Sequence, residues 1–310
     1  MLDNTNGELD LGNKSRDLLD FKKGNRFFLV SLLFLLTMTL VMGFVKLEST
    51  SRMMIIEYSL FIPIIGYFLI TKKPIRETLH LNSPGFLNMI LIIPLALCLI
   101  PAVGFLSALT SLIVKNHLAE ALTQFPQMSL FKWILTLAVT PAICEEFVMR
   151  GVILGSYKNI TIKKAALMNG LMFGILHLNV NQFVYAFVLG VIMAYLVYYT
   201  KSIFVTMFLH FCINGTSALG NWALQKYTEI LPTDVLADKQ DMISMLPQQA
   251  LIGITGAVFA WLILLTYKNR NAGNYEETYV GNEDKEFKVF DKYIIISIGI
   301  FIGSMIVFGA

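Results

Sequence analysis

Long apolar runs recur along the chain, and they limit the folds open to it more than any other feature. An α-helix needs about 20 residues to cross the hydrocarbon core of a bilayer, and most of the runs are close to that length. They occupy residues 27–46, 53–71, 86–114, 131–155, 165–179, 183–199, 202–222, 250–267 and 293–310. The sequence therefore predicts an all-α fold, a polytopic transmembrane helical bundle of eight or nine spans. The crossing of the ninth run is not tested by the distribution of Lys and Arg, because no charged segment follows that run in the sequence.

The composition agrees with a membrane protein and argues against other classes. Hydrophobic residues make up 56% of the chain and charged residues 15%, whereas about 25% of the residues of a soluble domain are charged. No basic stripe or binding motif indicates a nucleic-acid partner. The three cysteines lie in apolar segments without disulfide or zinc spacing, and we interpret them as buried apolar residues. The expected partners are the lipid bilayer and a membrane-associated peptide or protein.

Basic residues set the expected orientation, because cytoplasmic loops are enriched in Lys and Arg. With the N-terminus inside, the cytoplasmic segments hold 17 of these residues and the outer segments hold six. We therefore expect a multi-pass protein of a cell membrane with its N-terminus in the cytoplasm. The short loops, rich in Asn and Lys, fit a bacterial plasma membrane.

The chain divides into four parts. They are a polar cytoplasmic tail (1–26), N-terminal membrane helices (27–128), a membrane core with the candidate site (129–222), and an outer loop with C-terminal membrane helices (223–310). In the second part, Glu57 lies near the start of its span and is expected to snorkel to the interface. Pro94 and Pro101 are expected to kink the third span, and residues 117–127 to form a short interfacial helix.

Three charged side chains interrupt the fourth apolar run. Translocon scales assign about 2.5–3.5 kcal/mol to one Asp, Lys or Arg at the centre of a membrane helix. Glu146 and Arg150 are four residues apart, so they share a helical face with the acid N-terminal to the base, and we expect them to pair. Glu145 lies about 100° around the helix from Glu146 and has no local partner. An unpaired carboxylate in a membrane marks a candidate functional site.

Two histidines lie in later spans, each with a companion at helical spacing. Phe173 and His177 are four residues apart in the fifth span, as are His210 and Asn214 in the seventh, so each pair projects from one face. Ionisable groups in lipid need polar partners. The Glu, Arg and His side chains on these three spans can best serve as partners for one another in a single hydrated pocket. At about 1.5 Å per residue, Glu145 and the two histidines lie about 12–18 Å from the cytoplasmic ends of their spans. We therefore expect a site within the membrane, nearer its cytoplasmic face.

Such a set of side chains supports two kinds of hydrolysis. Glu145, His177 and His210 are candidate ligands of a catalytic Zn²⁺ with an open position, which would lower the pKa of a bound water to about 7. Without a metal, a desolvated glutamate is a general base, and histidine stabilises an oxyanion or protonates a leaving amine. Asn214 either orients the His210 imidazole or donates to the oxyanion. The motif H-E-x-x-H is absent, and the sequence leaves both routes open.

The three motifs together resemble those of the CPBP family, which includes the type II CAAX prenyl endopeptidases and the bacterial Abi-type bacteriocin-processing proteins. The resemblance covers about residues 130–220 and rests on these motifs: Glu145-Glu146-x-x-x-Arg150, Phe173-x-x-x-His177 and His210-x-x-x-Asn214. It implies an intramembrane endopeptidase, commonly called a metalloprotease, whose site opens to the cytoplasmic side. It also implies that Glu145 activates water, that His177 and His210 bind that water or a metal, and that Asn214 supports the oxyanion.

The resemblance leaves the substrate and the physiological role open. Bacterial relatives suggest bacteriocin immunity, peptide maturation or the regulation of signalling. An alternative is a non-catalytic membrane adaptor or immunity protein in which the polar groups only hold helices together, although such hydrogen bonds average about 0.6 kcal/mol each. A proton-coupled transporter is a third reading, and the lack of internal repeats weighs against it.

Overall fold

A computed structural model of the chain describes residues 5–114, 128–158, 160–227, 239–275 and 289–308. Within these ranges the fold is helical and contains no β-strand. One isolated antiparallel bridge joins Leu81 to Ser202. The predicted all-α class is confirmed.

The N-terminal part of the chain forms a series of helices that ends before residue 115. Their bounds are α1 (Thr5–Gly43), α2 (Ser49–Ser59), α3 (Phe61–Thr71), α4 (Ile75–Thr78), α5 (Phe86–Ile90) and α6 (Ile92–Ser111). The predicted interfacial helix at 117–127 lies outside the described residues. Because α1 begins at Thr5, it also takes in most of the segment that was predicted to be a tail preceding the first span.

The middle of the chain begins with one long helical run that contains two π-helical segments. Its parts are α8 (Leu130–Ile134), η1 (Leu135–Val139), α9 (Thr140–Glu146), η2 (Phe147–Ile153) and α10 (Leu154–Ser156), where η1 and η2 are π-helical. The helices that follow are α11 (Ile162–Leu176), α12 (Val180–Thr200), α13 (Ile203–Tyr227), α14 (Lys239–Arg270), α15 (Ala272–Tyr275) and α16 (Lys292–Phe308).

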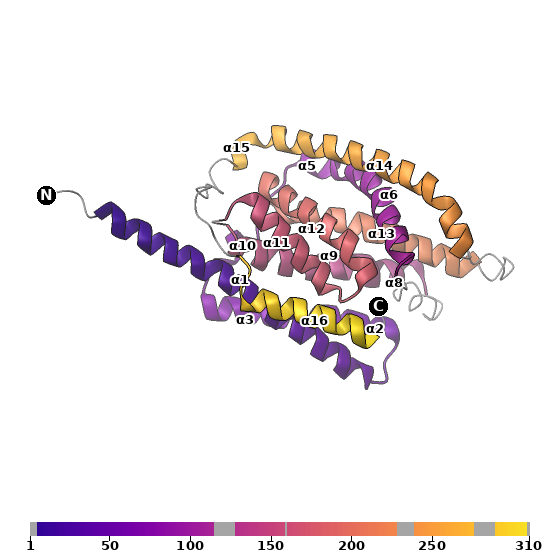
Figure 1. Ribbon diagram of the computed structural model, residues 1–310, viewed down its shortest axis with the longest axis horizontal. Helices are drawn as coiled ribbons and strands as arrows, with labels where there is room; N and C mark the ends of the chain where they lie inside the picture. Colours follow the sequence, from indigo (N-terminus) through magenta and orange to yellow (C-terminus); the bar gives the residue numbers. More distant parts are fainter. Residues whose placement is uncertain (1–4, 115–127, 159, 228–238, 276–288, 309–310) are drawn as a thin grey trace.

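The helices that carry the sequence motifs form the centre of the bundle. Figure 1 shows α9, α11, α12 and α13 between two outer groups, with α14 running along α6 on one side and α1 lying beside α16 on the other. The N-terminal end of α1 projects away from the bundle (Figure 1). The motif helices are therefore enclosed by helices from the N- and C-terminal parts of the chain.

The predicted multi-pass topology is confirmed. Each of the nine apolar runs is mostly helical where described, and six helical segments among the described residues are long and apolar enough to cross a membrane. These six are Asp20–Gly43, Ser49–Thr71, Phe86–Ser111, Val180–Thr200, Ile203–Lys226 and Ile243–Arg270. The remaining three are short or segmented: the run 130–156, α11 and α16.

Prolines explain the breaks within the second and third spans. A proline lacks the amide hydrogen and clashes with the carbonyl four residues earlier. Pro63 therefore disrupts the helix at Ser59, where α2 ends, and Pro94 disrupts it at Ile90, where α5 ends. Pro101 lies inside α6 without ending it.

Small residues allow α11 and α12 to pack closely against each other. A Cβ atom added to Gly190 would lie 2.6 Å from the Cα atom of Gly170, and one added to Gly170 would lie 2.6 Å from the carbonyl oxygen of Phe187. Close approach of helix backbones through glycine is a common means of association in membranes.

We expect Gly190→Ala to destabilise the protein by about 1–3 kcal/mol, because the backbone of α11 has to move away. The free energy of unfolding in mixed micelles measures this. Gly104→Ala is the matched control, since a Cβ atom at Gly104 meets nothing within 4 Å. Equal stabilities of the two variants would contradict the packing argument.

Candidate active site

The first π-helical segment, η1, takes part in a contact between the fourth and the seventh predicted spans. Pro141 has no amide hydrogen, so it cannot bond the carbonyl of Leu137 four residues earlier. Asn214 on α13 donates its Nδ2 hydrogen to that carbonyl at 3.1 Å. The contact places the Asn214 side chain beside the helix that carries Glu145, and it uses only one of the two amide hydrogens.

The second π-helical segment is held by side chains from two other parts of the chain. Asn169 on α11 donates to the carbonyl of Met149 at 2.7 Å, and Nδ1 of His80 lies 3.0 Å from the carbonyl of Arg150. Single turns of π-helix are frequent at functional sites. Here they turn the helix so that Glu145, Glu146 and Arg150 are all buried.

His80 makes the stability of this region depend on pH. Burial lowers its pKa from 6.5 to about 4; the nearby Lys201 acts in the same direction, and the contact with Arg150 opposes them. Between pH 6.5 and 4, the unfolded chain binds a proton at His80 that the folded chain does not. The free energy of unfolding therefore falls as the pH is lowered through this range.

The variant His80→Asn tests this pH dependence. Asparagine tolerates the left-handed backbone at this position, where φ is 52°, and it does not titrate. We expect the midpoint of thermal unfolding to fall less in His80→Asn than in the wild type between pH 7 and 5. An equal fall in both proteins would assign the effect to other groups.

Glu146 is the centre of a buried polar trio. Its Oε1 atom accepts from Nη1 of Arg150 at 2.9 Å and from Nδ1 of His210 at 3.0 Å. Glu146 and Arg150 are both fully buried, so the predicted pairing within the helix is confirmed. The contact with His210 was not predicted from the sequence. It fixes the His210 tautomer, because a carboxylate oxygen only accepts, so Nδ1 carries the hydrogen and Nε2 is left to accept.

The ring of Phe173 connects the three motifs. The Arg150 guanidinium lies 4.2 Å from its centroid, a distance typical of a cation–π contact. The rings of His177 and His210 meet it nearly edge-on, with centroids 4.9 and 5.9 Å away. Phe173 thus orients both imidazoles around one buried aromatic ring.

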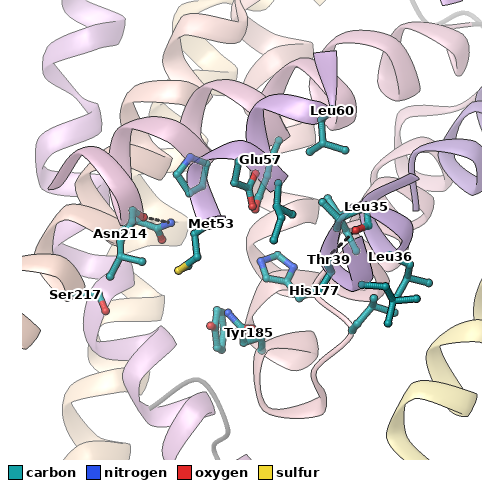
Figure 2. A pocket seen from close by; sticks show the side chains of 18 residues that line it. Leu35, Leu36, Thr39, Met53, Glu57, Leu60, His177, Tyr185, Asn214 and Ser217 are labelled. Carbon is teal, nitrogen blue, oxygen red and sulfur yellow. Dashed lines mark hydrogen bonds between the residues drawn. The ribbon is translucent and has the colours of Figure 1, made fainter. Parts of the chain in front are cut away.

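Glu145 and His177 face a common cavity of about 420 Å³. Figure 2 shows His177, Glu57, Tyr185 and Asn214 around this space. Nδ1 of His177 lies 2.8 Å from the carbonyl oxygen of Phe173. Since that oxygen only accepts, Nδ1 carries the hydrogen and Nε2 is left with a lone pair.

His210 approaches Glu145 from another side. Its Nε2 atom lies 3.9 Å from Oε2 of Glu145, a carboxylate oxygen that is buried and has no hydrogen-bond partner among the described residues. The structure therefore brings together Glu145, His177, His210 and Asn214, with Glu146 and Arg150 behind them. Each of the six predicted site residues is part of this arrangement.

The structure places His177 at the end of a helix. His177 follows the last residue of α11 instead of lying within the helix, and Leu178 after it has a left-handed backbone with φ of 50°. His177 is therefore at the end of α11 opposite to its first residue, Ile162. His210, by contrast, is near the start of α13, and the depth of the site in the membrane stays a prediction.

Glu57 belongs to the same cavity, although the sequence analysis placed it at the membrane interface. It lines the cavity with Glu145 and His177 (Figure 2), and its Oε2 atom is buried without a hydrogen-bond partner among the described residues. A single acid near the end of a span is compatible with snorkelling. The packing of α2 against α9 is what places Glu57 in the cavity and not at the membrane interface.

In the part of the chain that the structure describes, no group of three or more His, Cys, Asp or Glu side chains lies in an arrangement that could hold a metal ion. Nδ1 of His177 and Nδ1 of His210 are each bound to another protein atom, so Nε2 is the nitrogen that each histidine would offer to a metal. Zn²⁺ stays a prediction from the sequence, and no step below depends on it.

One comparison with known proteins matches the segment that holds the site. The sequence model of the family described as type II CAAX prenyl endopeptidase Rce1-like matches residues 127–216. No curated protein and no solved structure gives a significant match. The matched segment includes the six predicted site residues and excludes Glu57.

Proposed function

We propose that the chain is a member of the CPBP family of CAAX proteases, on the match of residues 127–216 to the type II CAAX prenyl endopeptidase Rce1-like family, and that it is an intramembrane endopeptidase. It hydrolyses a peptide bond of a membrane-associated peptide or protein. The observation that carries the proposal is a cavity lined by both Glu145 and His177, with Nε2 of His210 lying 3.9 Å from Oε2 of Glu145. A carboxylate with an unpartnered oxygen beside two imidazole lone pairs suits the activation of water.

In the proposed reaction, Glu145 is the general base. It takes a proton from a water molecule that Nε2 of His177 also holds, and the water oxygen forms a bond to the carbonyl carbon of the substrate. The carbon–nitrogen bond then breaks, and the proton passes from Glu145 to the leaving amine. The products are a carboxylic acid and an amine.

The remaining groups stabilise the charge that develops. The second amide hydrogen of Asn214 is available to the oxyanion, because only one is used by Leu137. His210 keeps its orientation through Glu146, and Arg150 balances the charge of Glu146. In this proposal Glu146 and Arg150 are positioning residues, whereas Glu145, His177, His210 and Asn214 contact the substrate or the water.

We also propose that the substrate enters from the outer side of the membrane. The cavity reaches Leu40 near the end of α1, Met53 near the start of α2, and Leu178 in the turn between α11 and α12. The loops at these ends, 44–48 and 177–179, contain one basic residue, Lys46. The loops at the opposite ends contain Lys72, Lys73, Arg76, Lys158 and Lys201, which the positive-inside rule assigns to the cytoplasm. The resemblance alone implies the opposite opening.

Cysteine labelling in intact cells tests this sidedness. In a chain without its three native cysteines, Ser217→Cys is expected to react with a membrane-impermeant maleimide added outside. Ser217 lines the cavity and is exposed. Ser83→Cys, exposed in the loop between α4 and α5, is expected to react only in inverted vesicles. The reversed pattern would show that the cavity opens to the cytoplasm.

Comparative proteomics of membranes tests the activity when the substrate is unknown. Membranes that contain wild-type protein should yield at least one peptide terminus that is absent when Glu145→Gln replaces it at equal abundance. A biological effect of the protein that survives Glu145→Gln unchanged would instead favour the non-catalytic adaptor.

A further inference from the structure

Glu57 is the carboxyl side chain of the cavity that the proposed reaction does not use. It lies on α2, outside the segment that matches the family. Two contacts follow Glu57 closely in the chain: Thr140 donates to the hydroxyl of Tyr58 at 3.3 Å, and the ring of Phe61, the first residue of α3, lies 5.8 Å from the ring of Phe147. These contacts dock the end of α2 and the start of α3 onto the helical run that carries Glu145.

No group in the described part of the chain neutralises Glu57. Its Oε2 atom is buried without a hydrogen-bond partner, as is Oε2 of Glu145, and the two carboxylates interact electrostatically. Arg150, the nearest buried cation in the motif, is held by Glu146 and is fully buried outside the cavity lining. The lining residues include no Lys or Arg.

The remaining walls of the cavity are mostly apolar. Apolar side chains of α1, of α2 and of the residue that follows α2 line the cavity with Glu57, and they are Leu35, Leu36, Leu40, Met53, Ile56 and Leu60. A buried carboxylate without a cation is costly, and a second one beside Glu145 adds repulsion between like charges. A ligand with an apolar stem and a positively charged end complements both the apolar wall and the Glu57 carboxylate.

We propose that Glu57 is a specificity residue that binds the ammonium or guanidinium group of a Lys or Arg side chain of the substrate. The aliphatic stem of that side chain packs on the leucines of α1 and on Met53 and Ile56 of α2, and its charge pairs with Glu57. This inference rests on the proposed function, because it names the class of peptide that the same site receives: an apolar segment with a basic residue. The cavity volume of about 420 Å³ is in the range of ligand-binding sites.

Binding of synthetic peptides tests the proposal without requiring cleavage. The probes are 20-residue apolar peptides that differ at one central residue, which is Lys, norleucine or Glu. Norleucine keeps the aliphatic stem and lacks the ammonium group. The full-length protein in nanodiscs is expected to bind the Lys peptide on the order of 30-fold or more tightly than the norleucine peptide, since a buried charge pair is lost with norleucine. The Glu peptide is expected to bind most weakly.

The variant Glu57→Gln is expected to abolish the preference for Lys and to leave the affinity for norleucine unchanged. It should unfold at or above the wild-type temperature, because it removes an unpaired buried charge. Glu48→Gln is the control, since Glu48 pairs with Lys132 in an exposed position, and it should keep the wild-type preference. Equal binding of Lys and norleucine by the wild type, or a preference that survives Glu57→Gln, would overturn the assignment.

The outcome separates this inference from the proposed function. A Lys preference in a protein that cuts no peptide would support the cation site and count against the endopeptidase. Cleavage without such a preference would support the endopeptidase and remove the role of Glu57.

Discussion

Glu145→Gln should reduce peptide-bond cleavage by the purified, membrane-reconstituted protein by about 10³-fold or more. Glutamine has nearly the same shape and keeps one acceptor oxygen, but it cannot take a proton from water. Loss of a general base that also holds the attacking water removes contributions of about 10²–10⁴-fold. The value of kcat/KM for a substrate found by proteomics measures the effect.

The interpretation of that result depends on an intact fold. Glu145 makes no hydrogen bond through its buried Oε2 atom in the described part of the protein, so Glu145→Gln should unfold close to the wild-type temperature. Glu48→Gln, at a residue that does not line the cavity, should retain full activity. Cleavage by folded Glu145→Gln at the wild-type rate would remove the proposed mechanism.

Arg150→Met should lower the free energy of unfolding by about 3–5 kcal/mol, the cost of leaving a buried carboxylate without its partner. Glu146 and Arg150 are both inaccessible to solvent, and their side chains meet at 2.9 Å. Removal of the guanidinium also removes the contact with the ring of Phe173 at 4.2 Å. Denaturant titration in mixed micelles measures the change.

The double variant Glu146→Gln with Arg150→Met separates charge from shape. It removes both charges, and Oε1 of the glutamine still accepts from Nδ1 of His210. Replacement of a whole buried pair by neutral groups is often close to neutral in stability, so most of the lost stability should return. A double variant as unstable as Arg150→Met would show that packing, and not the uncompensated charge, is responsible.

The two glutamates illustrate how far the sequence leads. Their spacing to Arg150 was sufficient to predict which of them pairs within the helix, because i, i+4 neighbours meet on one face of any α-helix. The sequence also predicted that Glu145 is near His177 and His210, because isolated polar groups in lipid gather together. It did not predict that Glu146 also holds His210, since that contact joins two helices whose register is set by packing.

Glu57 and His177 show the opposite case. The single acid of the second span was interpreted as an interfacial residue, and the hydrogen bond and aromatic contact that dock α2 beside Glu145 involve residues with no recognisable pattern. His177 was placed inside a helix that in fact ends just before it. The apolar stretch continues past the end of α11, so hydrophobicity does not mark this boundary.

The sequence by itself determined the helical membrane fold, the Glu146–Arg150 pair and the six residues of the candidate site, because these follow from helix length, helical periodicity and the cost of charge in lipid. The tertiary structure decided which carboxylates share the cavity, that Glu146 contacts His210, and that His177 lies at the end of α11. Those features depend on how helices far apart in the sequence are placed against each other, and local spacing carries no information about that placement.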